Sequence, residues 1–297
     1  MISLWNRRPS KGLYSPHTRE RRRLEGKSKG LAWLERDIYQ DTREAAWSMY
    51  NSSPEDQFRT SDQGEGFGDF ISFEAVKSWV ASEQARGKRI ASLDVCGQTR
   101  LGREAGVNRA IGWSLFDARP QKFKGGDSRE RIIEGSIFDL KSRTAVFGEL
   151  DALKEKEEIE LGLAIFRPWS GMHSYRRSRY GHMYFYEFLL RPVYQRMLEG
   201  GMILISSHFL VGMQLLRDIL DRTEGVEYIS NRTWQGYLIR KRSSVSQLRS
   251  LSEMGDLSAI SREFTMAKFE SYLPQILRWA ADMMSKEHAR RPKMLRE

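Results

Sequence analysis

The stretch "RIASLDVCGQTRLGREAG", residues 89–106, has the pattern of a buried strand that runs into a turn and then a helix. Its apolar run at residues 90–95 predicts a buried strand, and the "RLGREAG" that follows is typical of a helix. Asp94 lies where the strand ends, and Gly97 lies in the turn between strand and helix. In open α/β sheets, ligands bind outside the carboxyl ends of the strands. The turn therefore either holds a nucleotide-like cofactor or only connects a strand to a helix.

The same alternation of short apolar runs and helical stretches continues along the chain. Further strands are predicted at residues 110–115, 131–134 and 161–166, and "RTAVFGELDALKEKEEIE" at 143–160 is typical of a helix. Strands that alternate with helices predict a parallel sheet with helices on both faces.

The second half ends in a hairpin. A helix is expected over residues 183–199, closed by Gly200 and Gly201, and the unbroken apolar run "MILISSH" predicts a buried strand. Another helix, "FLVGMQLLRDILDR", precedes "VEYIS" and "WQGYLIRK", two strands that a short turn at "NRT" separates. These two predict an antiparallel hairpin at the edge of the sheet, for seven strands in all.

Polar or helical segments flank this α/β region. Residues 1–30 hold nine Lys or Arg against two Glu, and helices are expected at 30–50 and at 72–86, where Gly87 stops the second. Residues 244–297 are mainly helical in pattern. We therefore divide the chain into a basic arm with a helical N-terminal extension (1–69), an α/β domain (70–243) and a helical C-terminal appendix (244–297).

Composition restricts the partners and the compartment. Of 297 residues, 49 are Lys or Arg and 39 are Asp or Glu, a formal charge of +10, which favours nucleic acid or another anionic partner. Cys96 is the only cysteine, so neither an intrachain disulfide nor a multi-cysteine zinc site can form. No His, Asp and Glu cluster has metal-ligand spacing. We expect an intracellular protein, cytoplasmic rather than membrane-bound; an organelle address remains the alternative.

The series of elements resembles the Rossmann-like fold of class I S-adenosylmethionine-dependent methyltransferases over about residues 70–241. Four segments carry the resemblance: "LDVCGQT", "AIGWSLFD", "IIEGSIFDL" and "LEGGMILISSH". It implies an α/β, seven-stranded, mostly parallel sheet with an antiparallel terminal hairpin. The nicotinamide-binding alternative is weaker, because its first turn needs three glycines at a spacing that this chain lacks.

The resemblance also implies positions for S-adenosylmethionine. The first turn would approach the methionine part, the end of the second strand the ribose, and the third segment the adenine. The implied cofactor-binding residues are Asp94, Cys96, Gly97, Gln98, Ser114, Asp117, Ser136, Ile137 and Phe138. Ser114 and Ser136 stand where carboxylates are expected. Either Asp117 and Asp139 substitute for those carboxylates, or the fold persists without the cofactor.

The segment after the fourth strand lies where such enzymes place residues that face the substrate. Arg167, Pro168 and Trp169 are the catalytic candidates, in the place where amino-methylating enzymes carry Asn or Asp before Pro and an aromatic residue. A guanidinium cannot accept a hydrogen bond from an amino group, so that chemistry is not expected in its usual form. Arg167 could instead hold a phosphate or a carboxylate. His208, after the fifth strand, is a candidate base or a structural residue.

Basic and aromatic residues alternate beyond Trp169. Arginines that bind phosphates and aromatic rings that stack on bases are typical of single-stranded nucleic-acid binding. The candidate nucleic-acid-binding residues are Arg21, Arg22, Arg23, Tyr175, Arg176, Arg177 and Arg179. The alternative is a solvated basic loop followed by the buried aromatic face of a helix.

Three functions follow from these observations. The first is a methyltransferase that acts on nucleic acid, RNA in preference to DNA. The second is an inactive member of the fold that binds RNA or serves as a scaffold, in a ribonucleoprotein or with a protein partner on the basic arm. The third is a small-molecule methyltransferase.

Overall fold

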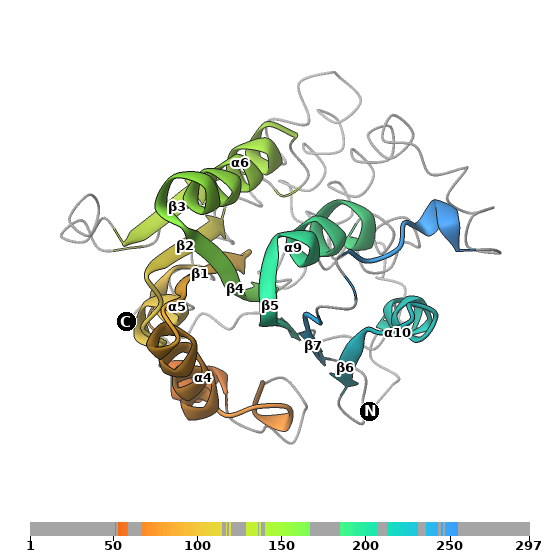
Figure 1. The fold of residues 1–297 in the computed structure, drawn as a ribbon, viewed down its shortest axis with the longest axis horizontal. Helices are drawn as coiled ribbons and strands as arrows, with labels where there is room; N and C mark the ends of the chain where they lie inside the picture. Colours follow the sequence, from red (N-terminus) through yellow and green to blue (C-terminus); the bar gives the residue numbers. More distant parts are fainter. Residues whose placement is uncertain are drawn as a thin grey trace, which may run out of the picture.

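A sheet of seven strands forms the centre of the molecule (Figure 1). The computed structural model describes residues 51, 53–58, 67–114, 117, 119, 129–135, 137, 140–166, 185–206, 213–230, 236–242, 245 and 247–254. The strands are β1 Arg89–Val95, β2 Arg109–Ser114, β3 Glu130–Glu134, β4 Ile159–Phe166, β5 Met197–Ser206, β6 Glu227–Ser230 and β7 Gly236–Arg240.

The strands pair in the order β3-β2-β1-β4-β5-β7-β6. β1 to β5 are mutually parallel, whereas β7 runs antiparallel to both β5 and β6. The described residues therefore confirm the predicted mostly parallel sheet with a terminal hairpin.

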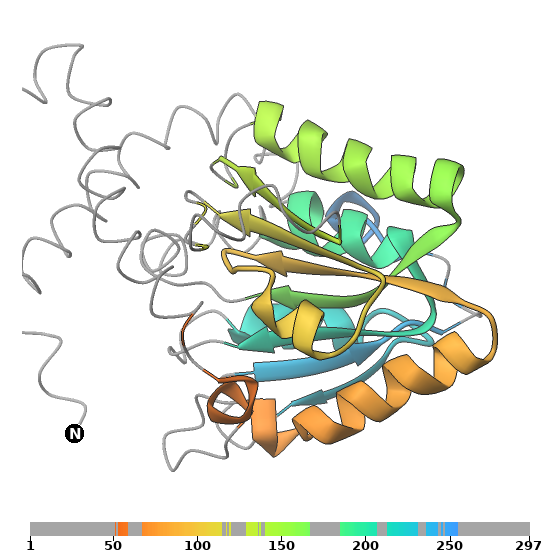
Figure 2. The ribbon, with the colours of Figure 1, turned by 90° about the vertical axis from the view of Figure 1, so that its left-hand side faces the viewer.

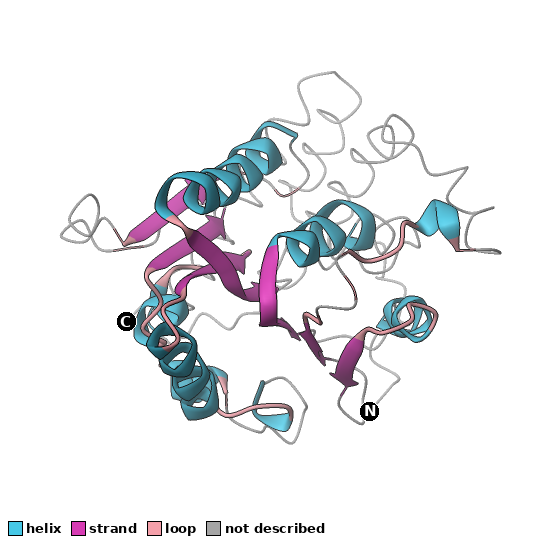
Figure 3. Cartoon of the chain, viewed as in Figure 1, coloured by secondary structure: helices cyan, strands magenta, loops and turns pink. Residues whose placement is uncertain are grey.

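Helices cover both faces of the sheet (Figure 3). The helical segments are α3 Pro54–Gln57, η1 Phe67–Asp69, α4 Phe73–Ala85, α5 Arg100–Glu104, α6 Leu140–Glu157, the π-helical η3 Phe185–Leu190, α9 Arg191–Arg196, α10 Met213–Asp221 and η4 Leu251–Glu253.

The sequence of α4 explains both of its ends. The Ser72 side chain accepts a hydrogen bond from the Ala75 backbone N–H (3.1 Å), which caps the helix start. Phe73, Val76 and Val80 recur at helical spacing and are buried. After the helix, Gly87 adopts φ +82°, a conformation that glycine takes at little cost. The helix predicted at residues 72–86 is confirmed.

Alternate residues of β1 build two cores. Leu93 and Val95 face the core beneath α6, η3 and α9, whereas Ile90 faces the core beneath α4 and α5. Figure 2 shows α6 and α4 on opposite sides of the sheet. Because both faces are covered, the central strands are almost continuously buried.

The helix predicted over residues 183–199 ends too late. α9 stops at Arg196, and β5 begins at Met197, which pairs with Leu161 of β4. Gly200, which we expected to close the helix, has φ +80° within β5, next to a register shift between β4 and β5. A strand irregularity therefore requires this glycine. The end predicted for the helix at 143–160 is also too late, because α6 stops at Glu157 and β4 begins at Ile159.

The segment 247–254 packs against the sheet domain. Leu248, Leu251 and Met254 are buried in the core that contains η3 and α9. The Glu187 carboxylate of η3 accepts hydrogen bonds from the Ser250 hydroxyl (3.0 Å) and the Leu251 N–H (3.1 Å). The start of the predicted C-terminal appendix thus shares the core of the α/β domain. The basic arm and the predicted helix at 30–50 lie outside the described residues, and the domain boundaries remain predictions.

Candidate functional site

The order of connections locates the candidate site at the carboxyl ends of the strands. From β1 the chain proceeds outward through β2 to β3 and then returns to β4, on the other side of β1. The direction of winding thus reverses between β1 and β4. In open parallel sheets a ligand-binding crevice forms at such a reversal. Asp94, Val95 and the turn that follows lie beside it.

Asp94 packs against the first turn. Its side chain is 3% exposed, and it lies so close to Gly97 that a Cβ on Gly97 would meet Asp94 Oδ1 at 1.9 Å. Real Cβ atoms do not approach another atom that closely, so a side chain at this position would force the buried Asp94 carboxylate to move. The contact with Asp94 accounts for Gly97 before any ligand is considered.

Cys96 holds a strained conformation in the same turn. Its φ is +59°, in the left-handed region that a side chain other than glycine enters at a cost of about 1–2 kcal/mol. Its N–H donates to the Trp113 carbonyl of β2 (2.8 Å), which continues the β1–β2 pairing beyond β1. Strain of this kind persists where the surrounding structure enforces it, and it clusters at functional sites.

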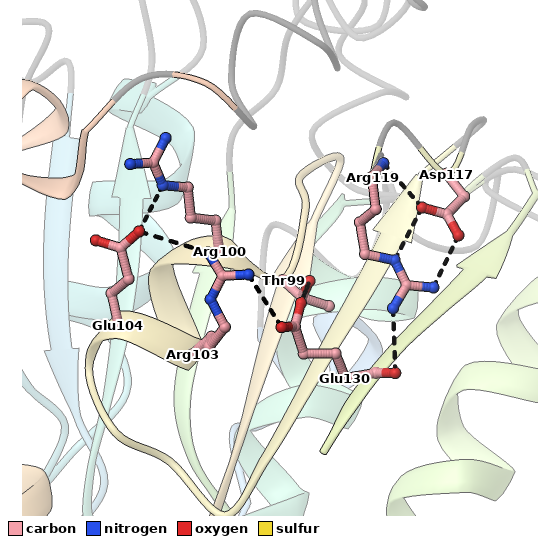
Figure 4. A network of polar contacts seen from close by, with 7 residues as sticks. All are labelled: Thr99, Arg100, Arg103, Glu104, Asp117, Arg119 and Glu130. Atoms are coloured by element: carbon pink, nitrogen blue, oxygen red, sulfur yellow. Dashed lines mark hydrogen bonds and ion pairs between the residues drawn. The ribbon is translucent and has the colours of Figure 1, made fainter. Parts of the chain in front are cut away.

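The end of the first turn is anchored to β3. Thr99 is fully buried, and its hydroxyl donates to the Glu130 carboxylate; Arg103 of α5 pairs with the same carboxylate (3.1 Å) (Figure 4). One buried acid therefore fixes both the start and the last turn of α5 against the sheet. Gln98, predicted to touch the cofactor, is 2% exposed in this arrangement.

Ser114 occupies the carboxyl end of β2, as predicted. It is 4% exposed and is in register with Glu134 of β3, and its carbonyl accepts a hydrogen bond from the Gly135 N–H (2.9 Å). The structure therefore brings Asp94, Ser114 and Glu134 to the ends of three neighbouring strands. Sequence reasoning missed Glu134, although it is the acid of "IIEG", directly at the predicted strand end.

Asp117, predicted as a substitute carboxylate, is paired with Arg119. Arg119 Nε donates to Asp117 Oδ1 (2.9 Å) and Nη2 to Oδ2 (2.7 Å), and Nη1 donates to the Glu130 carbonyl (3.2 Å) (Figure 4). Both side chains are largely buried, at 14% and 8% exposed. This fork fixes the segment after β2 onto β3. A role of Asp117 toward the cofactor remains a prediction.

The other predicted site residues divide in two groups. Ile137 is buried in the core beneath α6, at 6% exposed. The remaining ones lie outside the described residues: Ser136, Phe138, Asp139, Arg167, Pro168, Trp169, His208, Arg21, Arg22, Arg23, Tyr175, Arg176, Arg177 and Arg179. Their roles stay predictions.

Other kinds of site find no support among the described residues. No group of three His, Cys, Asp or Glu side chains there is arranged to hold a metal ion. A cavity of about 50 Å³ lies between Arg103, Val107 and Glu130, toward the amino ends of the strands. It is too small for a nucleotide, since ligand pockets occupy several hundred Å³. None of the described helices is long and apolar enough to cross a membrane.

The strand order decides the fold. A 3-2-1-4-5 parallel core, closed by a hairpin whose reversed strand lies between β5 and β6, is the arrangement that the resemblance implied. The chain has the class I methyltransferase fold.

Comparisons with known proteins find only distant similarity. No protein-family model and no curated protein sequence matches the chain. Among solved structures, MycE methyltransferase from the mycinamycin biosynthetic pathway is 13% identical over 58% of this chain and 49% of its own, about half its length, with a TM-score of 0.33. A Plasmodium falciparum protein described as a ribosomal RNA methyltransferase is 12% identical over 57% and 96%, with a TM-score of 0.33. A SAM-dependent methyltransferase from Archaeoglobus fulgidus is 16% identical over 57% and 93%, with a TM-score of 0.28.

The acceptors at the carboxyl ends of β1, β2 and β3 can be compared with the polar groups of S-adenosylmethionine. An ammonium group, two ribose hydroxyls and an adenine amino group all need hydrogen-bond acceptors. Asp94 supplies a carboxylate at β1, Ser114 a hydroxyl at β2 and Glu134 a second carboxylate at β3. These three acceptors suit the groups of the S-adenosylmethionine that the resemblance implied, with an acid at the end of β3 where one was expected at the end of β2.

Proposed function

We propose that this chain is an S-adenosylmethionine-dependent methyltransferase that acts on RNA. The observation that carries the first part is the row of acceptors Asp94, Ser114 and Glu134 at the carboxyl edge of a sheet with class I order. The net charge of +10 and the basic N-terminal arm support a polyanionic acceptor. RNA is favoured over DNA because single-stranded RNA offers unstacked bases to aromatic side chains.

The cofactor supplies an electrophilic methyl group when bound. The chain's own residues would bind and orient it: Asp94 at the first turn, and Ser114 and Glu134 at the next two strand ends. Holding two reactants in line can supply about 7–11 kcal/mol of the barrier, so catalysis would come mostly from positioning.

Titration of the full chain with S-adenosylmethionine tests the cofactor step. We expect saturable heat at millimolar ligand or below, lost in Asp94→Asn, a variant of nearly unchanged volume. Thermal unfolding of both proteins controls for folding. The absence of heat from the wild type would contradict the proposal. Transfer of labelled methyl groups to total cellular RNA, with DNA as the parallel acceptor, tests the second step.

A second function has an observation in its favour. Serine replaces the expected acid at the end of β2, and Arg119 binds both carboxylate oxygens of nearby Asp117. An inactive RNA-binding or scaffold protein of this fold would bind RNA with steep salt dependence, and Asp94→Asn would leave that binding unchanged.

In a small-molecule methyltransferase, by contrast, removal of residues 1–30 would leave activity intact.

A further inference from the structure

Glu134 differs from the other acids near the candidate site in being open to solvent. Its side chain is exposed, and among the described residues its carboxylate contacts the Asp117 backbone N–H, which donates to Oε1 (2.8 Å). Asp94 is buried against Gly97, and Asp117 is bound by Arg119. Glu134 is therefore an exposed carboxylate that one backbone N–H orients.

Strand alternation places Glu134 on the same face of the sheet as the first turn. A Cβ on Gly112 would lie 2.4 Å from Ile132 Cδ1 and 3.1 Å from the Gly97 carbonyl oxygen. Ile132 and the turn thus both cover Gly112 on one face. Residues two positions along a strand share a face, so Ser114 and Glu134 point to this face too, nearer the carboxyl edge.

The spacing suits a ligand that extends from the first turn across the strand ends. Neighbouring strands lie about 4.8 Å apart, so the carboxylate of β3 is one strand further from Asp94 than an acid at the end of β2 would be. Glutamate is one methylene longer than aspartate, which shortens that offset. Ser114, in register with Glu134, leaves more room between them than an acid would.

We propose that Glu134 is the acceptor for the ribose hydroxyls of the cofactor, in place of the acid that Ser114 replaces. This inference rests on the proposed function, because it assigns a residue to the same cofactor. The Arg119–Asp117 pair acts indirectly. It fixes the Asp117 backbone, whose N–H orients the Glu134 carboxylate. Glu134 touches the cofactor, and Asp117 is a positioning residue.

Binding of S-adenosylhomocysteine, which undergoes no methyl transfer, tests the assignment by isothermal titration of the full chain. Glu134→Gln keeps an oxygen for the Asp117 N–H but removes the charge. We expect the dissociation constant to rise by about ten- to a hundred-fold, the effect of one lost hydrogen bond to a charged group. With 2′,3′-dideoxy S-adenosylhomocysteine, which lacks both hydroxyls, the substitution should change binding by about twofold or less.

Glu199→Gln is the matched control, an exposed strand carboxylate near the start of β5, at the opposite end of the sheet. It should leave both dissociation constants within about twofold of the wild type. Equal binding of S-adenosylhomocysteine by wild type and Glu134→Gln, with unchanged thermal unfolding, would overturn the assignment and leave the proposed function standing. A wild type that binds neither ligand would overturn both.

Discussion

The two ends of the sheet use polar residues differently. At the amino end, Arg109 Nη2 donates to both oxygens of Glu157 (2.9 and 2.8 Å), Lys154 pairs with Glu160 (3.1 Å), and Asn108 accepts the Ile90 N–H (2.8 Å). These contacts join α6 and the loop before β2 to the starts of the strands. Each of these groups has its partner within the chain, so the contacts stabilise the fold without a bound ligand.

The carboxyl end combines one buried ion pair with two buried acceptors and one exposed carboxylate. Arg119 and Asp117 are more buried than Arg109 and Glu157, with exposures of 8% and 14% against 19% and 37%. Beside that pair lie Asp94, Ser114 and the exposed Glu134. Charged residues are therefore not all alike at this end: Arg119 binds both carboxylate oxygens of Asp117, whereas the nearby Glu134 is exposed to solvent.

Removal of one partner from each pair should separate the two ends most clearly. Asp117→Ala leaves the Arg119 guanidinium buried without its carboxylate, and we expect a loss of about 3–4 kcal/mol in the free energy of unfolding. Glu157→Ala should cost only about 1 kcal/mol, because its pair is more exposed. Urea unfolding of both variants measures the difference, and Asp117→Asn, which keeps one acceptor, should fall between them. Equal losses would contradict the contrast.

A buried lysine near the amino end should give the protein a pH-dependent stability. Burial lowers the pKa of Lys241 from 10.5 to about 8, and its Nζ donates to the Tyr194 carbonyl (3.1 Å). Between pH 8 and 10 the unfolded chain binds more protons at this residue than the folded chain does. This residue's contribution to the free energy of unfolding should therefore rise with pH, on the order of 2 kcal/mol over that range.

Denaturant unfolding at pH 8, 9 and 10 measures that contribution as a difference between the wild type and Lys241→Met. The variant fills a similar volume without a titrating group, so it should lack the rise. Parallel pH profiles of the two proteins would show that Lys241 does not titrate in this window.

The smallest expected change in stability concerns two residues other than glycine with positive φ, one at each end of the sheet. Glu158, before β4, has φ +54° and is exposed, whereas Cys96 has φ +59° and packs against the core. Glu158→Gly should gain about 0.5–1 kcal/mol by relief of the backbone strain. Cys96→Gly should gain less, because it also loses buried contacts. Thermal unfolding compares the two, and a larger gain at Cys96 would mean that strain outweighs packing there.

The regular elements could largely be predicted from the sequence. The central strands are apolar runs bounded by polar turns, as at residues 90–95, and α4 shows its cap and its stop in Ser72 and Gly87. The end of α9 could not be found in this way, since Met197 and Leu198 suit either a helix or a strand. Pairing with β4 makes them strand.

The candidate site was predicted only in part. Asp94, Gly97 and Ser114 follow from their places at strand ends, and the structure describes them there. Asp117 was chosen for its closeness along the chain to Ser114. Its partner Arg119 and the acid Glu134 emerged only when β2 and β3 were paired in register.

The sequence alone determined the order of strands and helices, because hydrophobic periodicity and turn residues are local properties. The tertiary structure alone decided which carboxylate is paired and which is open. Arg119 reaches Asp117 and the Glu130 carbonyl together, and Glu134 meets the Asp117 N–H, only after β3 has docked beside β2. Register between strands sets such contacts, and no local pattern encodes it.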